Sequence, residues 1–112
     1  MVAKWESIIF NLPNADDVAN KALEFLNNNP RSITEIEITS VKKDTNVEFT
    51  VFYLTMGPGP STGGWGWKKA TDLDDARNFL NGGGAYHSPV REAKIAGVIW
   101  EGTYLYYIFY RQ

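Results

Sequence analysis

The segment from Thr103 to Arg111 constrains the fold most, because it has the pattern of a β-strand with two apolar faces. Side chains alternate between the two faces of a strand. A two-layer sandwich covers one face of its sheet with helices and leaves the other in water, so this strand needs a second cover. The cover is either the tryptophan-bearing 57–67 loop of the same chain or the sheet of a second subunit that packs face to face. One face carries Leu105, Tyr107 and Phe109, and the other carries Tyr104, Tyr106, Ile108 and Tyr110.

We predict that the second cover is a second copy of the chain. Four Trp, six Tyr and six Phe are many for 112 residues, and an uncovered aromatic sheet would exceed the apolar patches that monomers usually expose. A tyrosine-rich core within a single chain is the alternative. The predicted homodimer interface consists of Tyr104, Tyr106, Ile108 and Tyr110.

Residues 57–67 form a predicted loop that contains five Gly and two Pro and ends in Trp65 and Trp67. Such indoles either cover apolar surface or stack on a ligand or partner, and the two lysines that follow would attract a phosphate or carboxylate. The spacing of Gly59 and Gly64 is that of a nucleotide-binding loop, but Trp and Gly follow where Lys and Ser/Thr are required. The alternative is a short extended segment whose Trp side chains pack on the sheet. The predicted ligand- or partner-binding residues are Trp65, Trp67, Lys68 and Lys69.

Periodicity predicts five strands and two helices. The strands are expected over residues 4–12, 33–41, 47–53, 90–100 and 103–111. One helix is expected from the N-cap Asn14 to about Asn27, with Asp16 and Asp17 complementing its dipole, and a second from Thr71 to Leu80. Only the step from Ile33 to Ile36 breaks the alternation of the second strand.

The resulting order, β-α-β-β-α-β-β, resembles a ferredoxin-like two-layer sandwich. We therefore expect an α+β fold with one largely antiparallel sheet and both helices on one face. Residues 1–112 are expected to form a single domain, because there is no internal sequence repeat and no linker that would divide the chain.

Composition excludes several classes of site. The chain has no Cys, which excludes disulfides, zinc–thiolate sites, iron–sulfur clusters and thiol nucleophiles and fits a cytoplasmic location. Its start has no signal-peptide pattern, and no run of about 20 apolar residues would cross a membrane. A net charge of −2 gives no bulk attraction to nucleic acid, which we therefore do not expect as a partner. We predict no cofactor and no metal, since the acids of 72–75 suit a helix N-terminus better than a cation site.

Catalytic groups are scarce. The single histidine, His87, could act as a general base, and Tyr86 and Tyr53 complete the proton-transfer candidates. We predict a small non-enzymatic binding module, homodimeric, that uses the 57–67 loop and the last strand as contact surfaces. Its alternatives are an enzyme of ferredoxin-like fold acting on a small organic substrate, and a protein that binds single-stranded nucleic acid.

Overall fold

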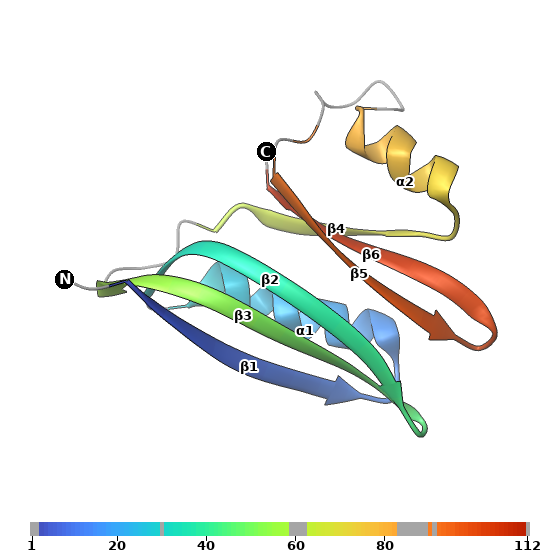
Figure 1. The fold of residues 1–112 in the computed structure, drawn as a ribbon, viewed down its shortest axis with the longest axis horizontal. Helices are drawn as coiled ribbons and strands as arrows, with labels where there is room; N and C mark the ends of the chain where they lie inside the picture. The colour runs from blue at the N-terminus through green and yellow to red at the C-terminus, as the bar shows by residue number, and fades with distance from the viewer. Residues whose placement is uncertain (1–2, 30, 59–62, 83–89, 91, 112) are drawn as a thin grey trace.

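A computed structural model describes residues 3–29, 31–58, 63–82, 90 and 92–111. Its elements are β1 (Lys4–Leu12), α1 (Ala15–Asn28), β2 (Arg31–Lys43), β3 (Asn46–Pro58), β4 (Trp65–Ala70), α2 (Leu73–Leu80), β5 (Glu92–Trp100) and β6 (Thr103–Arg111). The strands form two antiparallel three-stranded sheets, with the orders β1-β3-β2 (sheet A) and β4-β6-β5 (sheet B). The two sheets lie side by side in Figure 1.

The prediction of one ferredoxin-like sheet with both helices on one face is therefore wrong. The sequence analysis did not predict β4, because its first residues belong to the glycine-rich segment that was expected to be a loop. In the structure, Trp65 begins a six-residue strand that pairs with β6. The observed order is β-α-β-β followed by a second β-α-β-β. The two helices also lie on opposite faces of β6. Leu105, Tyr107 and Phe109 belong to the core that contains α1, whereas the alternate residues Tyr106, Ile108 and Tyr110 pack with α2.

Several local predictions are confirmed. The Asn14 side chain caps α1 by accepting hydrogen bonds from the backbone N–H groups of Asp16 and Asp17. The break in alternation after Ile33 is an irregularity in the β2–β3 register. The second helix is also present, but its N-cap is Asp72, so the prediction of Thr71 as the cap is wrong.

The two β-α-β-β units repeat in structure although the sequence shows no repeat. Both β-hairpins turn at a residue of positive φ, Asp44 at 54° and Glu101 at 50°. Where the sheets meet, β2 and β5 lie side by side and in the same direction. The Ser40 hydroxyl donates to the Gly97 carbonyl and the Lys94 ammonium contacts Glu37 at 2.9 Å, both across 57 residues. Side chains rather than a backbone ladder join the sheets at this border.

The main core lies between α1 and the inner faces of both sheets. Phe49 on β3 packs edge-on against Tyr107, at a centroid distance of 5.6 Å, and against Phe109, at 6.1 Å. A smaller core forms where Ala76, Phe79 and other residues of α2 cover the second face of β6.

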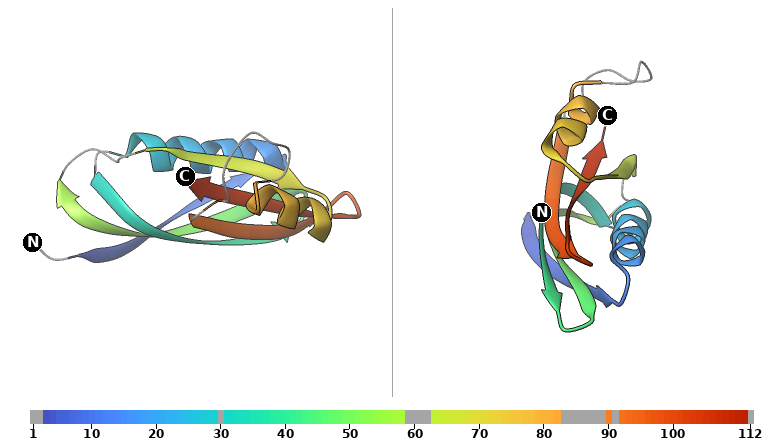
Figure 2. Two further views of the ribbon diagram at one scale, coloured as in Figure 1. Left: turned by 90° about the horizontal axis from the view of Figure 1, so that it is seen from above. Right: turned by 90° about the vertical axis from the view of Figure 1, so that its right-hand side faces the viewer.

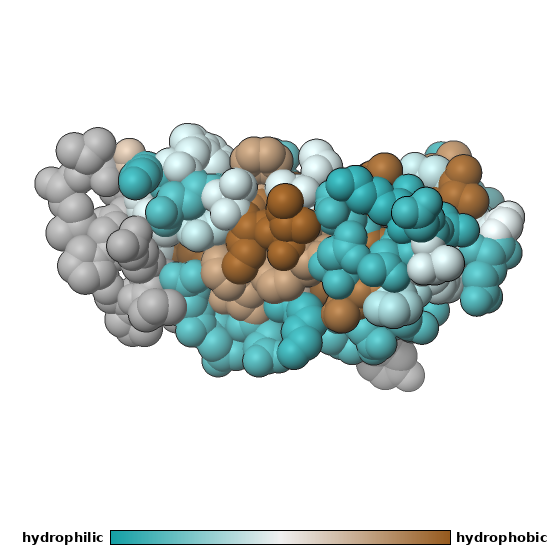
Figure 3. Space-filling model, turned by 90° about the horizontal axis from the view of Figure 1, so that it is seen from below, coloured by the Kyte–Doolittle hydropathy of each residue, from teal (hydrophilic) through white to brown (hydrophobic). Residues whose placement is uncertain are grey.

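The molecule is flat, only 17 Å across its shortest axis, with α1 along one side of the sheets (Figure 2). Apolar residues gather in the middle of the side along β1, with hydrophilic residues around them (Figure 3).

Replacement of Phe49 by Ala should destabilise the fold by about 3–5 kcal/mol, because it removes a fully buried ring that joins the two sheets. Phe52 lies on the opposite face of the same strand and is 43% exposed, so Phe52→Ala should cost less than about 1 kcal/mol. Urea unfolding of both variants measures the difference. Equal losses of stability would contradict the placement of Phe49 in the joint between the sheets.

Candidate functional site

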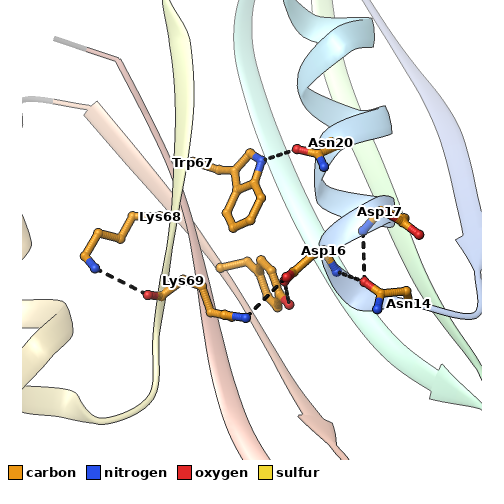
Figure 4. A network of polar contacts seen from close by, with 8 residues as sticks. Asn14, Asp16, Asp17, Asn20, Trp67, Lys68 and Lys69 are labelled. Atoms are coloured by element: carbon orange, nitrogen blue, oxygen red, sulfur yellow. Dashed lines mark hydrogen bonds and ion pairs between the residues drawn. The ribbon is translucent and has the colours of Figure 1, made fainter.

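A polar network joins the N-terminal end of α1 to sheet B (Figure 4). Asp16 lies in the first turn of α1, beside the N-cap Asn14. Its carboxylate accepts a 2.6 Å hydrogen bond from the Tyr107 hydroxyl and contacts the Lys69 ammonium at 3.3 Å. Both carboxylate oxygens are thus engaged, one by β6 and one by β4.

The environment of Tyr107 holds its hydroxyl in the protonated form. Burial raises the pKa of Tyr107 well above its ordinary value, and the hydrogen bond to Asp16 and the negative charge of that carboxylate raise the pKa further. The hydroxyl therefore remains a donor at neutral pH. This arrangement suits a structural hydrogen bond better than proton transfer.

The two tryptophans of β4 pack along α1. Trp65 is 4% exposed, and its backbone N–H and C=O both bond to the side-chain amide of Asn27. The Arg111 guanidinium lies over the Trp65 ring at 4.7 Å. Trp67 is half-buried and donates its indole N–H to Asn20 at 2.9 Å. Trp65 thus has almost no surface left for a ligand.

Lys68 and Lys69 point to opposite sides of β4, as strand alternation requires. Lys69 reaches Asp16 on the α1 side, whereas Lys68 lies 3.9 Å from Asp75 on α2. The two ammonium groups do not form one cationic site. The small pocket beside Asp16 has a volume of about 200 Å³, below the roughly 300–1,000 Å³ typical of ligand sites.

The predicted catalytic candidates are not brought together in the described residues. Tyr53 is half-buried on β3, with its ring 5.0 Å from that of Phe25. His87 and Tyr86 lie outside the described residues. No described group of three or more His, Asp or Glu side chains has the arrangement of a metal site. None of the helices in the described part of the chain is long and apolar enough to span a bilayer.

The residues predicted to form a dimer interface lie mainly against α2. Ile108 is fully buried there, and the Tyr110 ring packs edge-on against Phe79 at 4.8 Å. Tyr106 packs against the same small core, whereas Tyr104 is 47% exposed. The second cover of β6 is thus supplied largely by α2 of this chain, a cover that the sequence did not predict, and dimerisation through this strand stays a prediction.

The outer face of sheet A is the candidate site that sequence reasoning missed. Trp5 and Ile9 on β1 and Phe52 on β3 are 48%, 59% and 43% exposed, and the half-buried Leu54 lies opposite Trp5 in the ladder. Side chains of β2 continue the same face, with Glu37 opposite Phe52. We call the surface of Trp5, Ile9, Phe52 and Leu54 the open face.

The alternation of residues along the third predicted strand contained a signal for the open face. Residues 46–54 carry apolar side chains at both parities, with Val47, Phe49 and Val51 on one face and Phe52 and Leu54 on the other. Which set remains in solvent depends on the helix positions, and the sequence pattern does not contain these.

No protein-family model, curated protein or solved structure matches this chain.

Tyr107→Phe should destabilise the protein by about 1.5 kcal/mol, since it removes a hydrogen bond to a charged acceptor. The pKa of Tyr107 is raised on folding, so its contribution is fully present below the unfolded tyrosine pKa of about 10 and is lost as pH rises above that value. Urea unfolding from neutral pH to about pH 11 should show a steeper alkaline loss of stability for the wild type than for Tyr107→Phe. Tyr104→Phe, at an exposed tyrosine, is the control and should keep the wild-type slope.

Trp65→Ala should cost about 3–5 kcal/mol, because it empties a buried position of β4 in the main core. Trp67→Ala should cost less, since that side chain is half-buried and contributes one hydrogen bond to Asn20. Thermal and urea unfolding measure both changes. A Trp65→Ala variant as stable as the wild type would restore the interpretation of this indole as a ligand platform.

Proposed function

We propose that this chain is a small non-enzymatic binding module that holds a protein partner on the open face of sheet A. The exposure of Trp5, Ile9 and Phe52 on one face supports the proposal most directly. Contiguous apolar surface on a soluble domain commonly marks an interaction site. Trp65 and Trp67, which the sequence suggested for this role, are packed against α1 instead.

The composition of the open face supports the same proposal. Tryptophan is among the residues that most often dominate binding energy at protein interfaces. Most other residues of the outer face are polar, among them Ser7, Asn11, Thr39 and Glu35, although Val41 at the far end of β2 is also exposed. An apolar centre with a polar border is the usual anatomy of a protein interface.

The proposal also keeps two expectations from the sequence, namely that the protein is a homodimer and that it is located in the cytoplasm. The enzymatic and single-stranded nucleic-acid alternatives stay predictions, and no described feature favours either over protein binding.

Photo-crosslinking from position 52 in cells, followed by titration of the purified partner, tests the proposal. Phe52 and Trp5 lie on the same face, so we expect the double substitution Trp5→Ser, Phe52→Ser to weaken binding of that partner by at least about thirtyfold, the effect of losing one interface hot spot. The fold should persist, because both side chains lie outside the core clusters.

Leu73→Ser is the matched control, since Leu73 is 58% exposed but lies at the start of α2. This variant should bind the crosslinked partner as tightly as the wild type. Equal weakening by both variants, or crosslinks from a probe at position 73 and none from position 52, would overturn the proposal.

A further inference from the structure

β1 has a free edge. It hydrogen-bonds to β3 along one side, and no strand of the described residues pairs with its other side. In Figure 1 this strand forms the lower margin of sheet A. Nine residues without an internal proline or bulge leave a regular row of backbone N–H and C=O groups at this edge. Such an edge binds another extended strand.

A groove runs beside this edge, between β1 and α1. It has a volume of about 310 Å³ and is floored by Phe10 and Phe25, whose ring centroids are 5.9 Å apart. Lys21 and Glu24 of α1 lie on its rim. Apolar surface is visible along this side of the molecule in Figure 3. The occupant must therefore supply an extended backbone together with apolar side chains.

The charges of Lys21 and Glu24 on the rim favour a second copy of this chain as the occupant. Lys21 and Glu24 are exposed, opposite in charge and three residues apart, and neither is in an ion pair within the described part of the chain. A two-fold axis between them would bring Lys21 of each copy to Glu24 of the other, because two helices related in this way run antiparallel. The rim is thus complementary to itself.

The same axis can lie beside the free edge of β1, at the level of the middle of the strand. Ile8 is the central residue of Lys4–Leu12, and Phe25 contacts both Phe10 and Tyr53, which pairs with Glu6. Phe25 therefore lies at the level of Ile8 along the strand, one residue after Glu24 in α1. An axis perpendicular to the sheet at Ile8 pairs two β1 strands antiparallel and keeps both α1 helices on one side.

We propose that β1 is the docking site for a second copy of this chain, with Ile8 opposite Ile8 and with reciprocal ion pairs between Lys21 and Glu24. The two A sheets then form one six-stranded sheet, and the two grooves, each floored by Phe10 and Phe25, lie side by side across the axis. This interface differs from the β6 interface predicted from the sequence. It is also independent of partner binding on the open face, because it uses the edge of β1 and the rim of α1.

Charge reversal tests the dimer. Lys21→Glu or Glu24→Lys alone converts two attractions into two repulsions, and we expect the dimer dissociation constant to rise at least about tenfold. The double variant should recover wild-type affinity, because it exchanges the charges. An equimolar mixture of the two single variants should form a heterodimer, since one contributes two acids and the other two lysines. Sedimentation equilibrium from micromolar to millimolar concentration measures each constant.

Hydrogen exchange of β1 amides tests the strand pairing. An edge strand has every second amide exposed, whereas a paired strand has both sets protected, so wild-type protection of the second set should rise with protein concentration. A wild-type chain that stays monomeric at millimolar concentration would overturn the proposal. So would a dimer that is insensitive to the single reversals, or one whose β1 amides exchange as in the monomer. Thermal unfolding of the single variants at low concentration confirms that the charge changes leave the monomer folded.

Discussion

The rest of the structure depends on β6 being covered on both faces. On one side, Tyr107 and Phe109 pack against Phe49, and this contact joins sheet B to sheet A and to the core beneath α1. On the other side, Ile108 lies under α2. Burial of each large apolar side chain contributes roughly 1.5–3 kcal/mol, so neither cover can be lost without removing a large part of a typical domain's net stability. The arrangement of both helices follows from this one strand.

The two β-α-β-β units have the same order but unequal helices, and this inequality explains the open face. α1 is 14 residues long and contacts β1, β3 and β4, so it serves both sheets. α2 is 8 residues long, and the residues that it buries belong to sheet B. The outer face of sheet A corresponds in the repeat to the face of sheet B that α1 covers. Nothing of comparable length covers it in the described residues.

Local patterns could be predicted from the sequence, and their assembly could not. The Asn14 cap and the irregularity after Ile33 each depend on a few neighbouring residues, and the structure shows both. The division into two sheets depends on which distant strands pair, and β4 lacked the composition of a strand because three of the residues just around Trp65 are Gly. The open face was missed for the same reason, since Phe49 and Phe52 are distinguished only by what packs above them.

In the proposed function, opposite faces of the same strands serve stability and binding separately. Phe49 and Phe52 are three residues apart on β3, yet one is fully buried and the other is 43% exposed. Ile8 packs against the core while Ile9 faces solvent. Because a rigid ladder fixes both faces, substitutions on the outer face can alter a partner's affinity while leaving the packing around Tyr107 nearly unchanged. A strand with two apolar faces can therefore serve as core and contact surface at once, provided that one face stays clear of the chain's own helices.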